Sequence, residues 1–132
     1  MADYDRDGFL DLYLCTYSHF IGASEDKAGT PTPYHDARNG PADVLFRNDG
    51  RGRFVDATAD AGLTEGNDGF GFAAAWGDYD DDGWPDLLVA NDFGRKNLYH
   101  NEGLQGGKVR FRDVAYAEDQ ACARDAMGAG WR

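Results

Sequence analysis

The hydrophobic residues of this chain fall into short runs, and most of these runs have glycine, asparagine or aspartate on at least one side. Short runs between turn-forming residues are typical of β-strands, whereas amphipathic helices need longer stretches with a period of about 3.6 residues. We therefore expect strands over Leu10–Tyr17, Gly71–Trp76 and Asp86–Ala90.

Two β-hairpins are expected from a shared pattern of strand, turn and strand. The first covers Val44–Asp56, with its turn at Asn48-Asp49-Gly50. The second covers Asn97–Asp113, with its turn at Asn101-Glu102-Gly103 and a longer tip. Asparagine and glycine tolerate the positive φ angles that hairpin turns require, so both sites suit a reversal of the chain.

An acidic loop precedes two of the expected strands. Residues 3–15 read D-Y-D-R-D-G-F-L-D-L-Y-L-C, and residues 78–90 read D-Y-D-D-D-G-W-P-D-L-L-V-A. The two segments are identical at seven of thirteen positions, namely both D-Y-D triplets and the following D-G and D-L pairs. A chance acidic turn seldom recurs with the same internal spacing, so the loop marks a repeat.

The spacing within each loop suits a calcium ion, which takes six to eight oxygen ligands at about 2.3–2.6 Å. Alternate positions of a tightly curled loop point inward, and the glycine at position 6 permits the sharp turn. We predict two Ca²⁺ sites, since the repeat supplies the same carboxylates twice. The predicted carboxylate ligands are Asp3, Asp5, Asp7 and Asp11 in the first loop and Asp78, Asp80, Asp82 and Asp86 in the second, where the backbone carbonyl of Trp84 is a further ligand.

Two other interpretations of these loops were weighed. An EF-hand would place a bidentate Glu at position 12, but the second loop has Val89 there, inside an apolar run. An acidic surface turn without an ion is the simpler alternative. It would crowd four carboxylates into nine residues with no cation to offset their repulsion.

Composition narrows the class of protein. The chain has 132 residues, enough for one ordinary domain, and its net charge of −11 makes nucleic acid and anionic membranes unlikely partners. Two bound Ca²⁺ ions, with four positive charges, would reduce that charge to −7.

No apolar run approaches the roughly 20 residues needed to span a bilayer, so we expect no membrane insertion. Cys15 and Cys122 leave the redox compartment open, because both a disulfide and two separate thiols are compatible with the sequence.

The repeat sets the domain organisation. We expect one unit over residues 1–77, with an insertion loop at about 18–42, and a second unit over 78–132. Met127–Trp131 resembles the segment that leads into the second acidic loop, so the chain reads as two units of a longer array, and further blades are expected in the full-length protein. Two interpretations of the insertion stay open, a plain surface excursion and a partner-binding surface, since loops on repeat folds often carry function. Its candidate contact residues are Tyr34, His35, Asp36 and Arg38.

Each unit supplies about four short strands, which is the signature of a β-propeller blade. The fold class expected is therefore all-β, with about two four-stranded antiparallel blades from a larger propeller. In this arrangement the acidic loop joins the first and second strands of a blade.

The D-x-D-x-D-G-x-x-D loops resemble those of FG-GAP and VCBS repeats, the calcium-binding blades of integrin α-subunit-like propellers. Phe70-Gly71 stands at the place of the family's Phe-Gly, while Val89-Ala90-Asn91 replaces its Gly-Ala-Pro. The V-A-N-D and N-L-Y-H-N segments, with the lead-in at Met127–Trp131, look still more like ASPIC/UnbV-associated propellers. The resemblance implies a secreted, extracellular or periplasmic location and adds the carbonyl of Phe9 to the ligands. It also places the side chains of Arg6 and Asp81 on the outside of the loops.

Three functions were compared. A calcium-binding module for adhesion to a protein or polysaccharide ligand agrees best with the resemblance. A calcium-dependent polysaccharide lyase or hydrolase is less favoured, because the acids cluster in loops, no G-x-S-x-G motif occurs, and His19, His35 and His100 show no metal-site spacing. We therefore predict no catalytic residues. A structural spacer that binds only calcium is the third possibility.

Overall fold

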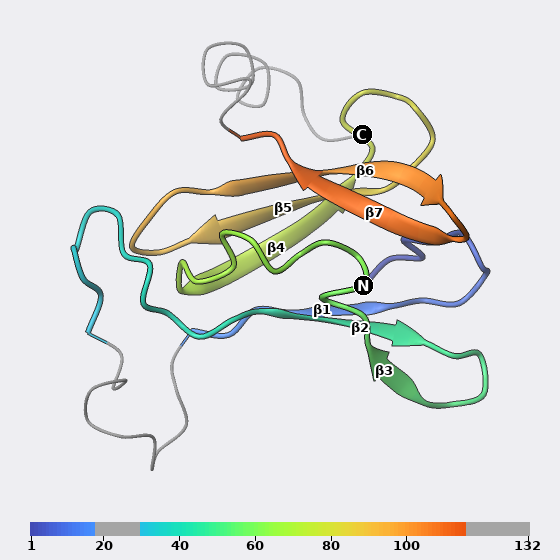
Figure 1. Ribbon diagram of the computed structural model, residues 1–132, viewed down its shortest axis with the longest axis horizontal. Helices are drawn as coiled ribbons and strands as arrows, with labels where there is room; N and C mark the ends of the chain where they lie inside the picture. The colour runs from blue at the N-terminus through green and yellow to red at the C-terminus, as the bar shows by residue number, and fades with distance from the viewer. Residues whose placement is uncertain (18–29, 116–132) are drawn as a thin grey trace.

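The computed structural model describes residues 1–17 and 30–115, and within these ranges the chain is all-β (Figure 1). The strands form two antiparallel sheets, one of three strands and one of four. No helix that could cross a membrane occurs in the described ranges. The strands of the first sheet are β1 (Leu12–Leu14), β2 (Val44–Asn48) and β3 (Phe54–Asp56); those of the second are β4 (Gly71–Gly77), β5 (Asp86–Asn91), β6 (Asn97–Gln105) and β7 (Lys108–Asp113).

The second sheet has the four-stranded meander expected of a propeller blade. Its strand order is β4-β5-β6-β7, and each neighbouring pair is antiparallel. The second acidic loop joins β4 to β5, the first and second strands, as predicted. The sheet thus begins at Gly71 with β4. The repeat in the sequence was counted from the acidic loop, which comes one strand later.

The repeat extends to the pairing register of the strands. Leu12 lies opposite Phe46 in the first sheet, and the corresponding Leu87 lies opposite Tyr99 in the second. A lone bridge between Ala2 and Asp11 matches the pair formed by Gly77 and Asp86 at the end of β4. The two sheets are therefore copies of one backbone pattern.

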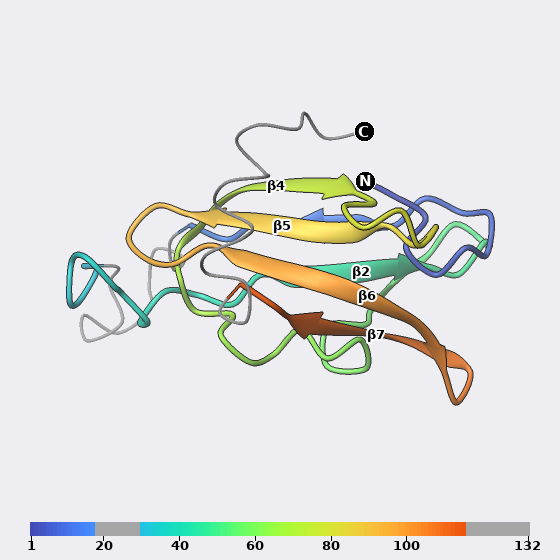
Figure 2. The same cartoon turned by 90° about the horizontal axis from the view of Figure 1, so that it is seen from above.

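The core lies between the two sheets, which pack face to face (Figure 2). Tyr13 and Leu45 enter this core from the first sheet. Aromatic contacts cross it, with the ring centroids of Tyr4 and Phe111 5.8 Å apart and those of Tyr13 and Trp76 6.4 Å apart. The second sheet contributes Leu87, Val89, Tyr99, Val109 and Phe111.

The face of the first sheet that packs into the core corresponds to the outer face of the second sheet, so the two copies of the repeat bury opposite faces. Side chains alternate between faces along a strand, so Leu14 and Phe54 of the first sheet occupy the positions that Val89 and Phe111 hold in the second. Val89 and Phe111 are buried, but Leu14 and Phe54 are each 48% exposed. The first sheet thus presents to the outside the face with which the second sheet packs.

The second hairpin differs from its prediction. Asn101-Glu102-Gly103 is not a turn but part of β6, which continues to Gln105, and the chain reverses at Gly106-Gly107. A register shift between Asn101 and Leu104 marks a β-bulge. The positive φ of Gly103, 69°, is used in this bulge. The first hairpin turn was predicted correctly, since β2 ends at Asn48 and β3 begins at Phe54.

The first expected strand is shorter than its hydrophobic run. The run Leu10–Tyr17 is expected to form the strand, but β1 covers only Leu12–Leu14, which pair with Val44–Phe46 of β2. Cys15 follows directly and is partly buried, and burial together with the nearby Asp43 carboxylate raises the pKa of its thiol to about 11. Cys122 and the segment Met127–Trp131 lie outside the described residues, so neither the disulfide nor the third lead-in is tested.

Candidate metal centres and a candidate contact surface

The two acidic loops have the same internal hydrogen bonds. In each, the first aspartate accepts two backbone N–H groups at positions 5 and 6, and the position 5 aspartate accepts the N–H at position 7. In the first loop, Asp3 accepts from Asp7 at 3.0 Å and Gly8 at 2.9 Å, and Asp7 accepts from Phe9 at 2.9 Å. In the second, Asp78 accepts from Asp82 at 3.1 Å and Gly83 at 2.8 Å, and Asp82 accepts from Trp84 at 2.8 Å.

Positive φ angles curl both loops in the same way. Arg6 and Asp81, at position 4, each have φ of 59°, while Gly8 and Gly83 have φ of 94° and 90°. A side chain at φ near 90° is strained, which explains the glycine at position 6. Arg6 and Asp81 are both exposed, in agreement with the outward orientation expected for position 4.

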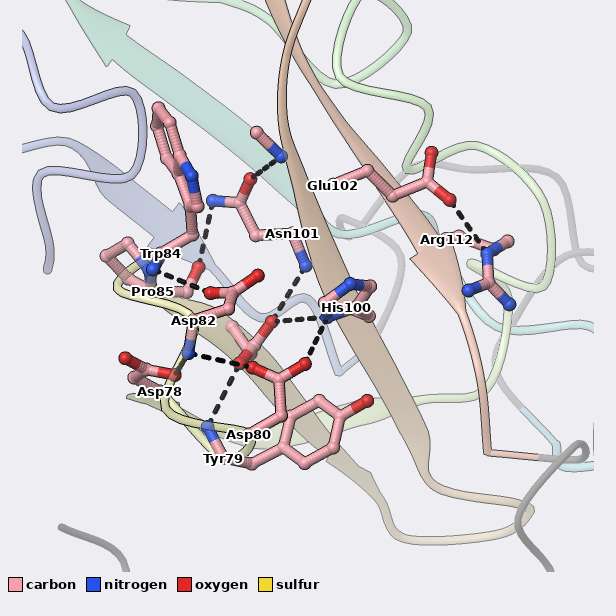
Figure 3. A network of polar contacts seen from close by, with 12 residues as sticks. Asp78, Tyr79, Asp80, Asp82, Trp84, Pro85, His100, Asn101, Glu102 and Arg112 are labelled. Carbon is pink, nitrogen blue, oxygen red and sulfur yellow. Dashed lines mark hydrogen bonds and ion pairs between the residues drawn. The ribbon is translucent and has the colours of Figure 1, made fainter.

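The last aspartate of each loop is fully buried and fastens the loop to the next strand. Asp11 accepts the N–H of Tyr4 at 3.2 Å and that of Asn48 at 2.8 Å. Asp86 accepts the N–H of Tyr79 at 3.0 Å and that of Asn101 at 2.8 Å (Figure 3). Each carboxylate therefore links the start of its loop to a neighbouring strand, which is β2 for Asp11 and β6 for Asp86.

Burial makes these two negative charges costly. Loss of solvation raises the pKa of Asp11 to about 6, although the N–H groups of Asn48 and Tyr4 pull it in the opposite direction. The pKa of Asp86 is raised for the same reason. A divalent cation beside these carboxylates would offset the lost solvation, so the donor set fits an oxygen-bound ion.

The structure brings most of the predicted carboxylates together. Ligand atoms of Asp3, Asp5 and Asp11 lie within 4.8 Å of one another, as do those of Asp78, Asp80 and Asp82. Asp86 groups with Asp80 and with His100, a residue whose spacing in the sequence gave no indication of a metal site. Asp7 lies outside the first trio. The assignment of the backbone carbonyls of Phe9 and Trp84 as calcium ligands stays a prediction.

The predicted contact residues of the insertion lie at the other end of the sheets, where β5 leads into β6 (Figures 1 and 2). Tyr34 is 73% exposed, and its ring centroid is 5.0 Å from that of Phe93. Asp36 pairs with Arg95 at 3.6 Å. His35 is exposed. A shallow pocket opens beside them, lined by Asp36, Ala37, Arg38, Gly66, Asp68, Gly69, Asn91, Arg95 and Asn97.

Further aromatic side chains border this surface. Tyr17 packs against Phe70, Phe72 and Phe93, with ring centroids 6.2–6.3 Å apart. Phe72 is 70% exposed. The Tyr17 hydroxyl donates to Asp92 at 2.7 Å. The end opposite the acidic loops thus combines exposed rings with charged and amide groups.

Comparison with known proteins assigns the family. Residues 3–89 match the FG-GAP-like repeat. The chain belongs to the FG-GAP-like repeat family. Over 80 residues it is 41% identical to cartilage acidic protein 1 of Mus musculus and 42% identical to cartilage acidic protein 1 of Homo sapiens. The matched stretch covers 61% of this chain and 12% of each relative, so the chain corresponds to a small part of their length.

The two sheets of this FG-GAP-like chain contact each other directly at their acidic loops. The guanidinium carbon of Arg6 lies 5.2 Å from the centroid of a Trp84 ring, which places a cation of the first loop over an aromatic side chain of the second. The Asn101 side chain donates to the carbonyl of Tyr4 at 3.0 Å. The acidic loops are therefore part of the interface between repeats as well as turns within them.

Sequence reasoning missed two kinds of residue at these FG-GAP-like loops. Asn48 and Asn101 were assigned to hairpin turns, but their backbone N–H groups hold the buried aspartates. His100 contacts Asp86, with Nδ1 3.2 Å from Oδ1. The spacing along the chain carries no signal for this contact, because residue 100 comes to lie opposite Asp86 only through the register that pairs Leu87 with Tyr99.

Proposed function

We propose that this chain is part of a calcium-stabilised β-propeller that acts as a non-enzymatic binding module in an extracellular or periplasmic setting. The observation that carries the proposal is the pair of acidic loops with matching hydrogen bonds and φ angles. Membership of the FG-GAP-like family and similarity to proteins named for cartilage support an extracellular role. The proposed ligands are the loop carboxylates with the carbonyls of Phe9 and Trp84, and the ion supplies charge neutralisation.

Calcium should stabilise the chain. Extracellular modules bind Ca²⁺ with dissociation constants of about 10⁻⁴–10⁻³ M, so millimolar calcium would add about 0.4–1.4 kcal/mol per site. We expect chelation to lower the melting temperature and added calcium to restore it. Asp80→Ala should reduce this response, whereas Asp81→Asn, at the exposed position 4, should keep it. A melting temperature insensitive to both chelator and calcium would refute the metal assignment.

We also propose that the protein continues with further blades. The first sheet exposes Leu14 and Phe54, and the corresponding residues of the second sheet are buried against a neighbouring repeat. An added blade would cover these side chains by the packing already present between the two repeats. This supports a longer array of the same unit.

The surface around Tyr34, His35, Asp36 and Arg38 is the proposed site of partner contact. Exposed aromatic rings beside charged and amide groups suit a polysaccharide, since sugar rings present apolar faces and many hydroxyl groups. The exposed ring of Tyr34 against Phe93 and the adjoining polar pocket provide both kinds of contact.

A panel of immobilised glycans tests this surface. Tyr34→Ala should weaken binding by at least about fivefold, because aromatic anchors typically contribute more than about 1 kcal/mol. The control is Leu104→Ala, which removes a side chain 61% exposed at the β6–β7 hairpin tip, the other end of the sheet. Equal binding by wild type and Tyr34→Ala would place the contact elsewhere, and no binding by any variant would favour a structural spacer.

A further inference from the structure

The two acidic loops differ in the residue that the neighbouring strand, β2 in the first sheet and β6 in the second, places opposite the buried aspartate. Arg47 of β2 and His100 of β6 occupy the same position of the repeat, opposite Val55 and Arg112 in their respective sheets. An arginine carries its charge permanently and has no lone pair to offer a metal. A neutral imidazole is a good metal ligand. The difference therefore changes what the second loop can bind.

His100 is placed within ligand distance of two carboxylates. Its Nδ1 lies 3.2 Å from Oδ1 of Asp86 and 3.5 Å from Oδ2 of Asp80 (Figure 3). Ligand atoms at about 2.1 Å from one ion, with angles of about 90–115°, are about 3.0–3.5 Å apart. The distance from His100 Nδ1 to each carboxylate oxygen therefore matches the distance between two ligand atoms that bind one transition-metal ion.

The surrounding fold holds this arrangement. Asp86 is fully buried and fixed by the backbone N–H groups of Tyr79 and Asn101. The His100 side chain is 17% exposed, and the ring of Tyr79 packs edge-on against it with centroids 5.8 Å apart. Two ligands on neighbouring strands are therefore oriented by the sheet, and Asp80 completes the set from the loop.

We propose that the second acidic loop binds a first-row transition dication, with zinc as the representative, through Asp80, Asp86 and His100. One nitrogen and two oxygens suit Zn²⁺ better than Ca²⁺, which prefers oxygen ligands throughout. Binding requires the imidazole proton on Nε2, so that the ion takes the place of the proton between Nδ1 and Asp86. Zinc and calcium would compete for Asp80 and Asp86 in this loop, while the first loop keeps its oxygen ligands. The inference rests on the His100 geometry and does not require calcium binding to be correct.

Calorimetric titration with zinc chloride tests the proposal on the full 132-residue chain. His100→Arg gives the second loop the residue of the first and should weaken the zinc site by at least about tenfold, because it removes a direct ligand and the loss of an outer-shell partner alone typically costs about 10–100-fold in affinity. His19→Ala removes a histidine that belongs to neither the proposed zinc ligands nor the proposed contact residues, and it should leave the isotherm unchanged. Both cysteines are present in every variant, so zinc bound to thiols contributes equally.

Two further measurements make the result decisive. Circular dichroism shows whether His100→Arg is folded, and His100→Gln, a neutral and smaller change, replaces it if it is not. A calcium titration of the wild type separately tests the proposed function. Loss of the zinc site in folded His100→Arg or His100→Gln supports the proposal, whether or not calcium binds. An isotherm indistinguishable from wild type in the folded variant overturns it. Absence of calcium binding in wild type would refute the proposed function instead.

Discussion

Replacing Asn101 with alanine is expected to destabilise the chain by about 2–4 kcal/mol. Asn101 is fully buried, and its side-chain nitrogen donates to the carbonyls of Tyr4 and Pro85, both at 3.0 Å. Its side-chain oxygen accepts the N–H of Gly103 at 3.0 Å. Alanine would leave these backbone groups without their partner, and each buried group left unpaired costs about 1–3 kcal/mol. One of them, the Tyr4 carbonyl, belongs to the other repeat.

The first repeat provides the matched control for this change. Asn48 holds the same position in β2, is partly exposed, and bonds the N–H of Gly50 at 3.0 Å and the carbonyl of Leu10 at 3.3 Å within its own repeat. Water can replace these bonds, so Asn48→Ala should cost about 1 kcal/mol or less. Urea unfolding of the two variants measures the difference. Equal losses would show that the contact between repeats adds no stability.

The acidic loops were the part of the fold most fully predictable from sequence. Their conformation follows from local chemistry, since aspartates at alternate positions accept nearby N–H groups and glycine takes the positive φ at position 6. The same locality made the Asn48-Asp49-Gly50 turn predictable. Because the loops recur, the sequence between them could be divided into repeat units of about four strands. The four-stranded sheet formed by β4 to β7 confirms this number of strands for one unit.

Features that depend on contacts between distant segments were harder to predict from the sequence. The second hairpin was misplaced because Asn101-Glu102-Gly103 has the composition of a turn, but in β6 it forms a bulge beneath Trp84. A Cβ on Gly103 would lie 3.0 Å from the indole ring, so the close approach of Trp84, together with the positive φ of the bulge, favours glycine here. Local composition cannot distinguish these two uses of the same tripeptide.

His100 was overlooked for a related reason. Spacing along the chain separates it from Asp86, and only the pairing of β5 with β6 brings the two side chains together. The packing of Tyr4 against Phe111 between the sheets was equally hidden, since it depends on which face of each sheet is covered. The sequence repeat alone does not specify how the units stack.

The largest expected change in binding is the loss of one calcium ion per chain when a single loop is altered. Asp80→Ala removes a carboxylate from the second loop, and Asp5→Ala removes the corresponding one from the first. Each variant should keep the other loop intact, because the loops draw their carboxylates from separate segments. Since calcium affinity depends on the number of charged oxygen ligands, the altered loop should bind too weakly to fill at millimolar calcium.

Counting bound ions by equilibrium dialysis with radioactive calcium tests the central claim most directly. At about 10 mM calcium, well above dissociation constants of about 10⁻⁴–10⁻³ M, we expect close to two ions per chain in wild type and one in each single variant, with none in the double variant Asp5→Ala/Asp80→Ala. Wild-type chains that bind no calcium at millimolar concentration, or variants that still bind two ions, would contradict the assignment of these loops as a pair of calcium sites.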